Sequence, residues 1–99
     1  MLSFSQLVWK ATKKIPKGKV ATYQIIAKMI HRPKSARAVG NALNKNPYAP
    51  QVPCHRVVRS DGQVGGFASG ASDKIKILKK EGITIINKKV TPLAKFLYS

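Results

Sequence analysis

The sequence predicts a mostly α-helical domain with a small β-hairpin, arranged as a winged-helix-like helix-turn-helix. Apolar residues recur at helical spacing in several short segments, and two of these segments are separated by a tight polar turn. An Asp-Gly pair then follows between two short runs rich in β-branched residues. With 99 residues, of which 43% are hydrophobic, the chain is long enough for a modest core, and we expect one domain over residues 1–99.

The first helix is expected to begin after Ser3, because Ser3 and Gln6 have the spacing of a capping box. A stripe at helical spacing follows, made of Phe4, Leu7, Val8 and Ala11. The helix should end near residues 15–18, where proline and glycine interrupt it.

The helix-turn-helix is predicted from two short helices. Thr22 can cap a helix over residues 23–30, and Ser35 can cap the next one after a turn at residues 31–34. The second helix has one apolar stripe and one face of small and polar residues, Arg37, Gly40, Asn41 and Asn44. Small residues allow a helix to approach DNA closely, although many helical pairs share this pattern and alone it is not specific.

The predicted hairpin lies around Asp61-Gly62, with one strand in residues 56–59 and the other in residues 63–65. A fourth helix is expected to begin at Ser72 and Asp73 and to end at residues 81–82. The expected remainder is a strand at residues 83–86 and a short helix that starts at Thr91-Pro92 and buries Leu93, Phe96 and Leu97.

The charge balance predicts a polyanionic partner. Nineteen Lys and Arg stand against three Asp and Glu, giving a net charge of +16, and such an imbalance repels itself in the folded state. Nucleic acid is favoured, a basic surface that only aids solubility is the alternative, and no basic amphipathic helix with an aromatic face supports a membrane. Without a secretory signal, we expect a cytoplasmic, nucleoid-associated or a nuclear protein that is not secreted.

The lone cysteine, Cys54, lies beside His55 and Arg56 in an apolar stretch. A free thiol has a pKa of about 8.5, so a nucleophilic cysteine needs a base or a positive field to form the thiolate. In an extended segment, Cys54 and His55 would point to opposite faces, and the base would have to act through a water molecule. A buried, inert Cys54 and a surface His55 are the open alternatives.

Glu81, the only glutamate, lies at the end of the predicted fourth helix, where the helix dipole disfavours a negative charge. A specific partner would explain this position. A histidine is a natural one, because a carboxylate fixes its tautomer, and ordinary pairing with Lys79 or Lys80 is the alternative. One cysteine and two histidines without ligand spacing predict no metal site, and nothing in the sequence indicates a cofactor.

The stretch Pro53-Cys54-His55-Arg56-Val57 resembles the signature of the O6-alkylguanine-DNA alkyltransferases, in their DNA-binding and catalytic domain. Supporting stretches follow in the order and spacing of that family, at residues 18–23, 36–40, 46–47, 64–67 and 80–82. The resemblance covers roughly residues 4–86. Because the chain begins at the first helix of that domain, we expect the N-terminal domain usual in the family to be absent.

The resemblance implies a role for each matching residue. Cys54 would be the alkyl acceptor, His55 its base through a water molecule, and Glu81 the residue that orients His55. Tyr23 would donate its hydroxyl proton toward guanine N3. Arg37 would take the place of a flipped nucleotide, on a DNA-facing helix that also presents Ala36, Gly40 and Asn41. The pocket would comprise Pro53, Val57, Phe67, Ala68 and the hinge residue Asn46, with backbone groups of Cys54 and Val57 contacting the base.

The resemblance also implies the partner, double-stranded DNA containing O6-alkylguanine, with O4-alkylthymine as a further substrate to consider. A monomer would act once per molecule, because nothing regenerates the thiol. Two departures are Phe67, where the family often has tyrosine, and Ala68-Ser69-Gly70 in place of Ser-Gly-Gly. One alternative is a non-catalytic, lesion-sensing alkyltransferase-like protein, against which Cys54 argues because such proteins replace the cysteine. The other is a winged-helix regulator with an incidental thiol.

Overall fold

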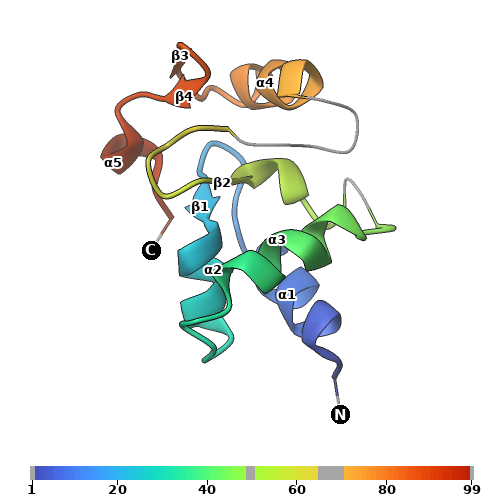
Figure 1. Ribbon diagram of the computed structural model, residues 1–99. Coiled ribbons are helices and arrows are strands. Elements are labelled where there is room, and N and C mark those ends of the chain that lie inside the picture. The colour runs from blue at the N-terminus through green and yellow to red at the C-terminus, as the bar shows by residue number, and fades with distance from the viewer. Residues whose placement is uncertain (1, 49–50, 65–70, 99) are drawn as a thin grey trace.

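The computed structural model describes residues 2–48, 51–64 and 71–98, and it confirms a helix-rich fold with small strands (Figure 1). The helices are α1 (Phe4–Thr12), α2 (Tyr23–Met29), α3 (Ala36–Asn44), α4 (Ala71–Lys80) and α5 (Leu93–Phe96). The strands are β1 (Ala21–Thr22), β2 (Val57–Val58), β3 (Ile85–Ile86) and β4 (Lys89–Val90), and a 3-10 turn, η1, spans Cys54–Arg56.

Of the three side-chain caps predicted at helix N-termini, two are confirmed. The Ser3 hydroxyl accepts a hydrogen bond from the Gln6 N–H at 3.2 Å, and the Gln6 side chain accepts one from the Ser3 N–H, so the capping box is confirmed. The Thr22 hydroxyl caps α2 by accepting from the Ile25 N–H at 3.1 Å. The predicted cap at Ser35 is wrong, because its hydroxyl donates to the Arg32 carbonyl at 2.6 Å and makes no cap to α3.

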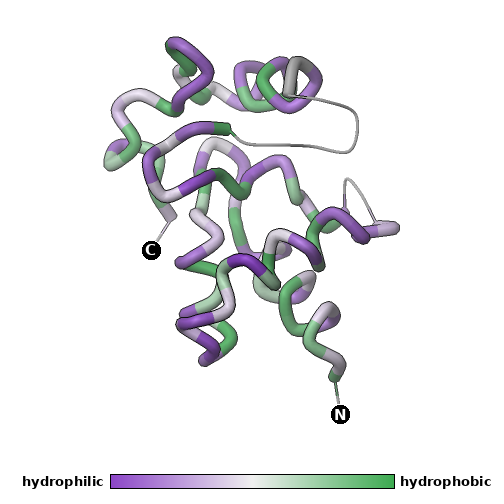
Figure 2. The backbone as a smooth tube through the Cα atoms, viewed as in Figure 1, coloured by the Kyte–Doolittle hydropathy of each residue, from purple (hydrophilic) through white to green (hydrophobic). Residues whose placement is uncertain are grey.

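Two hydrophobic clusters meet at the parallel pair β1–β2. Helices α1, α2 and α3 enclose the first cluster, and α4, the β3–β4 hairpin and α5 enclose the second (Figure 1). Ala21 and Val57 pair across the strands and belong to the first cluster, whereas Val58 belongs to the second. Successive residues of a strand face opposite sides, so this short ladder joins both halves of the molecule. In Figure 2, hydrophobic and hydrophilic positions alternate along α4, which covers one side of this junction.

The hairpin forms in a different place from the predicted one. Residues 57–58 pair in parallel with β1. In the described residues the predicted pairing is reduced to a turn, in which the Arg59 N–H donates to the Gln63 carbonyl and the Gly62 N–H donates to the Arg59 carbonyl. Gln63 instead bridges to Lys89, and the antiparallel hairpin is β3–β4. Its two turn residues, Asn87 and Lys88, have φ values of 52° and 63°. The Asp-Gly signal therefore predicted the turn correctly and the partner strand wrongly, because the strand partner is set by long-range packing.

None of the helices that the structure describes is long and apolar enough to cross a membrane.

Candidate active site and nucleic-acid interface

The segment that precedes Cys54 is tied down by Asn46. The Asn46 side-chain amide donates to the Val52 carbonyl at 2.9 Å, and its oxygen accepts from the Tyr48 N–H at 2.8 Å. The same Val52 carbonyl accepts from the Cys54 N–H at 2.8 Å. One asparagine just beyond α3 therefore fixes the turn that carries Cys54 relative to the helix-turn-helix.

Cys54 begins a 3-10 turn, so the extended case considered for Cys54-His55 does not apply. Pro53 precedes the turn, and its carbonyl accepts from the Arg56 N–H at 2.9 Å. With three residues per turn, the side chains of Cys54, His55 and Arg56 project about 120° apart. His55 is 4% exposed and Cys54 is half-buried, so the alternative of a surface histidine is excluded.

His55 and Glu81 form the pair that the sequence predicted. His55 Nε2 lies 3.1 Å from Glu81 Oε2. A carboxylate only accepts hydrogen bonds, so the neutral imidazole carries its proton on Nε2 and leaves Nδ1 free as the acceptor. Lys79 and Lys80, the alternative partners, are exposed at the end of α4, while Glu81 turns inward toward His55.

Arg56 is the second partner of Glu81, and the sequence did not predict it. Its Nε donates to Glu81 Oε1 at 2.9 Å and one terminal nitrogen donates to Oε2 at 2.7 Å, a bidentate pair. Its other terminal nitrogen donates to the Ile15 carbonyl at 2.9 Å. The one sequence feature that could have indicated a cationic partner is the excess of Lys and Arg over a single glutamate. That excess does not single out Arg56.

The pKa values of the pair follow from burial and charge. Burial acts to raise the pKa of Glu81, but hydrogen bonds from Arg56 and His55 outweigh it and leave the pKa below its ordinary value. Burial lowers the pKa of His55. The Glu81 carboxylate opposes this, and the positive charges of Arg56 and Lys74 add to it, so the net direction is downward. The imidazole is therefore neutral at pH 7 and able to accept a proton.

Lys74 is a buried lysine on α4 that the sequence analysis also missed. It is 1% exposed, and its Nζ donates to the Val57 carbonyl at 2.7 Å. Burial lowers the pKa of Lys74 to about 8, against an opposing effect of Cys54. The sequence feature that could have indicated its burial is its position one helical turn before Leu78, which is buried. Lys74 thus places a positive charge near Cys54 and holds the strand that follows it.

Tyr23 lies at the start of α2 and packs against α3. The Tyr23 ring lies against Gly40 of α3, and a Cβ atom added at Gly40 would make an ordinary van der Waals contact with it at 3.7 Å. Burial raises the pKa of Tyr23; the charge of Arg59 opposes this, and Cys54 adds to it. The hydroxyl therefore stays protonated at neutral pH and can donate. The effects of Arg59 and Cys54 on this pKa indicate that Tyr23 lies near both residues.

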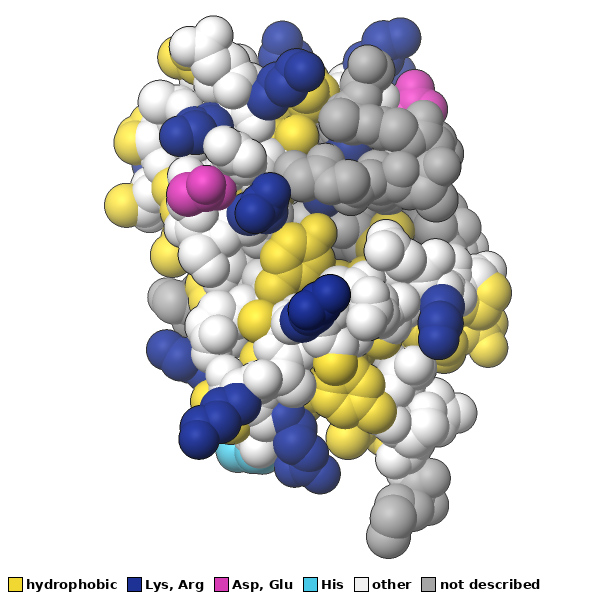
Figure 3. Space-filling view, viewed as in Figure 1, with side chains coloured by type: hydrophobic (Ala, Val, Ile, Leu, Met, Phe, Trp, Pro, Cys, Tyr) yellow, Lys and Arg dark blue, Asp and Glu magenta, His cyan; other side chains and the backbone are white. Residues whose placement is uncertain are grey.

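Helix α3 presents its polar face to solvent. Arg37 and Asn41 are exposed, Ala36 and Gly40 are half-buried, and the opposite face is buried at Val39, Ala42 and Leu43. Figure 3 shows Lys and Arg side chains spread over the face that contains the helix-turn-helix, with few acidic side chains between them. The arrangement fits contact with a phosphate backbone.

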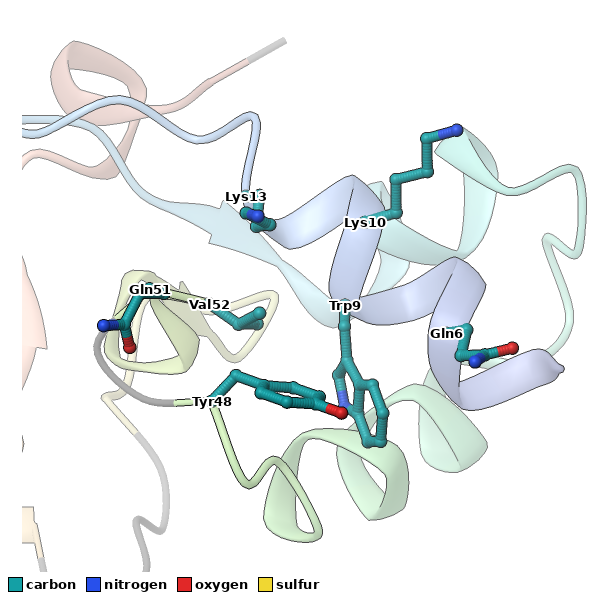
Figure 4. A pocket seen from close by; sticks show the side chains of 7 residues that line it. All are labelled: Gln6, Trp9, Lys10, Lys13, Tyr48, Gln51 and Val52. Carbon is teal, nitrogen blue, oxygen red and sulfur yellow. The ribbon is translucent and has the colours of Figure 1, made fainter. Parts of the chain in front are cut away.

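The pocket expected for a base can be assigned in part. Pro53 and Val57 are buried beside Cys54, while Phe67 and Ala68 lie outside the described residues. A separate hollow of about 350 Å³ opens beside the segment that leads to Cys54 (Figure 4). Trp9 and Tyr48 meet edge to face there with ring centres 5.5 Å apart, and the Trp9 Nε1–H donates to the Ala42 carbonyl. The hollow is lined by Gln6, Trp9, Lys10, Lys13, Tyr48, Gln51 and Val52.

The described residues contain no cluster of three or more His, Cys, Asp or Glu side chains that could hold a metal ion.

Comparison with known proteins places this geometry in context. The family model described as the DNA-binding domain of 6-O-methylguanine DNA methyltransferase matches residues 3–83. A methylated-DNA–protein-cysteine methyltransferase of Methanosarcina acetivorans is 52% identical over 79 residues, which are 80% of this chain and 51% of that protein. The bifunctional transcriptional activator and DNA repair enzyme Ada of Escherichia coli is 44% identical over 79 residues, 80% of this chain and 22% of that protein.

Solved structures of proteins bound to DNA have folds similar to this chain. The Mycobacterium tuberculosis OGT in complex with DNA has a TM-score of 0.79 and 43% identity, covering 82% of this chain and 50% of that chain. Atl1 of S. pombe, in complex with damaged DNA containing O6-carboxymethylguanine, has a TM-score of 0.88 and 30% identity, covering 100% of this chain and 99% of that chain. The chain spans about half the length of the Methanosarcina relatives it matches.

Proposed function

The chain belongs to the 6-O-methylguanine DNA methyltransferase family, and on this premise we propose that it moves the alkyl group of O6-alkylguanine in duplex DNA onto Cys54. The observation that carries the proposal is the buried His55–Glu81 pair, joined at 3.1 Å and directly adjacent in sequence to the half-buried thiol of Cys54. A neutral, oriented imidazole beside a cysteine is the arrangement that activates a thiol as a nucleophile.

The transfer is a single displacement. The thiol proton passes to His55 Nδ1 through a water molecule, and Glu81 stabilises the imidazolium that results. The thiolate sulfur attacks the alkyl carbon, forming the C–S bond as the bond from that carbon to O6 breaks. The departing guanine carries the negative charge, and the Tyr23 hydroxyl donates toward its N3. The product is a thioether, which no further step cleaves, so each molecule acts once.

The target base must leave the duplex before the thiol can reach it, because a half-buried sulfur cannot approach an atom inside the base stack. Extrusion of a nucleotide costs a few kcal/mol. An exposed Arg37 on α3 is suited to fill the vacated space, and the basic surface is suited to hold the phosphates. Asn46 holds the turn that carries Cys54 next to this helix, so the thiol lies at a fixed position relative to the DNA-facing side chains.

The second candidate function is lesion sensing without transfer. The likeness to Atl1 over the whole of this chain supports it, and the presence of Cys54 counts against it. A sensor would bind alkylated duplex DNA and leave the cysteine unmodified.

Intact-protein mass spectrometry after incubation with duplex DNA containing O6-methylguanine separates the two functions. We expect the wild type to gain one methyl group, mapped to Cys54, with no more than one equivalent transferred. Cys54→Ser should gain none and still bind the lesion duplex, because the residues that engage DNA are unchanged. Tight binding by an unmodified wild type would refute transfer and favour the sensor.

A further inference from the structure

Arg56 joins three segments that are far apart in the sequence. It lies in the turn that carries Cys54, pairs with Glu81 at the end of α4 through two hydrogen bonds of 2.9 and 2.7 Å, and donates to the Ile15 carbonyl after α1. Its side chain is 17% exposed and that of Glu81 is 11% exposed, so water screens the pair weakly.

Glu81 Oε2 is shared between two donors. Arg56 donates to it at 2.7 Å, and His55 lies 3.1 Å from the same oxygen. The carboxylate charge is therefore divided between a guanidinium, which is always protonated, and an imidazole, which titrates. Whatever negative charge Arg56 offsets is no longer available to stabilise an imidazolium.

We propose that Arg56 is a positioning residue that shares Glu81 with His55 and thereby sets the pH at which His55 loses its proton and can serve as the base for Cys54. The inference deepens the proposed function, on which it rests for its catalytic meaning. With Arg56 in place, His55 becomes available as a base at a lower pH than Glu81 alone would permit.

The direction of the effect follows from the charges that contact or surround His55. A nearby positive charge favours every deprotonation, and a nearby negative charge disfavours every one. Arg56 and Glu81 must therefore shift the protonation of His55 in opposite directions. Among the described residues, Lys74 of α4 also acts on His55, and Tyr23 of α2 and Arg59 lie near Cys54.

Alkylation of Cys54 by iodoacetamide measures this directly. The thiolate attacks the carbon that bears iodine, a thioether forms and iodide leaves, and mass spectrometry detects only Cys54 because the chain has one cysteine. The rate is measured against pH for wild type, Arg56→Gln, Glu81→Gln and Arg56→Lys. Arg32→Gln, in the exposed turn between α2 and α3, is the control for loss of a positive charge elsewhere.

The midpoint of the rise in rate should move up by about one pH unit in Arg56→Gln and down by a similar amount in Glu81→Gln. Arg56→Lys keeps the charge and loses the bidentate geometry, so its midpoint should lie between those of wild type and Arg56→Gln. Arg32→Gln should match wild type. Midpoints that stay fixed, or that move in the same direction for Arg56→Gln and Glu81→Gln, would overturn the proposal.

Loss of one member of a buried ion pair can unfold a small domain, so the double variant Arg56→Gln/Glu81→Gln is measured as well. It removes both charges, and its midpoint should return to within a few tenths of a unit of wild type. A double variant that keeps the shift of either single variant would contradict charge sharing. Iodoacetamide needs no DNA, so these results stand even if methyl transfer from O6-methylguanine fails, and the two proposals fail separately.

Discussion

The helix-turn-helix and the segment around Cys54 differ in where their polar side chains lie. Along α3 the polar side chains point to solvent, and Arg37 and Asn41 can be changed without loss of a core contact. Around Cys54 the polar groups are inside: Arg56, Lys74 and Glu81 connect residues between 17 and 41 positions apart. Substitutions on α3 should therefore change DNA binding without changing the reactivity of Cys54. Substitutions around Cys54 should change both its reactivity and the stability of the fold.

Removal of the imidazole should have the largest effect. His55→Ala is expected to reduce the transfer rate by about 10²- to 10⁴-fold on both duplex O6-methylguanine and free O6-benzylguanine, because the base acts in both reactions. Stopped reactions followed by mass spectrometry measure both rates. The control is His31→Asn, since His31 is the other histidine, is exposed, and has a φ of 60°, which asparagine tolerates. A comparable loss of transfer rate in His31→Asn would show that the effect is not specific to the region around Cys54.

The buried lysine should make stability depend on pH. The unfolded chain takes up the Lys74 proton near its ordinary pKa of 10.5 and the folded chain only near pKa 8, so between these values the unfolded state holds more protons. Stability from this group therefore rises with pH across that window. Relative to Lys74→Met, the wild type should gain about 3 kcal/mol in free energy of unfolding from pH 8 to pH 10.5.

Urea unfolding of both proteins at several pH values gives this difference, and titrations common to both cancel. Lys76→Met, at an exposed position of the same helix, should show a flat difference from wild type. A flat difference for Lys74→Met as well would mean that this lysine is not buried as a cation, and the coupling of folding to charge around Cys54 would lose its main support.

The smallest effects should appear at the helix starts of the other region. Thr22→Ala removes a cap hydrogen bond of 3.1 Å and should lower the free energy of unfolding by about 1 kcal/mol. Ser35→Ala should lower it by less than about 0.5 kcal/mol, because its hydroxyl caps no helix. Thermal or urea melts compare the two; equal losses would show that Ser35 does cap α3 in solution.

The contrast between the two regions also explains what could be predicted from the sequence. The capping box at Ser3, the cap at Thr22 and the exposed face of α3 depend on neighbours within four residues, and all were predicted. Ser35 failed because a hydroxyl can bond either forward into a helix or back to the Arg32 carbonyl, and the sequence does not decide between them.

Around Cys54, the position of Glu81 against a helix dipole indicated a specific partner such as a histidine, and the family resemblance implied that this partner is His55. The sequence did not predict that Arg56 shares that carboxylate or that Lys74 is buried, because both depend on long-range placement of β2 and α4. The predicted hairpin at residues 56–65 failed for the same reason: Val57 and Val58 pair with β1, which lies more than 30 residues earlier.

We propose that DNA engagement and alkyl transfer depend on separable regions of the molecule. The most direct test is the ratio of transfer rates from duplex O6-methylguanine and free O6-benzylguanine in Arg37→Ala, compared with Arg56→Gln. We predict that Arg37→Ala loses roughly 10- to 100-fold on the duplex and nothing on the free base, since only the duplex requires extrusion of a nucleotide. Arg56→Gln should lose equally on both. Equal losses on both substrates in Arg37→Ala would contradict the account.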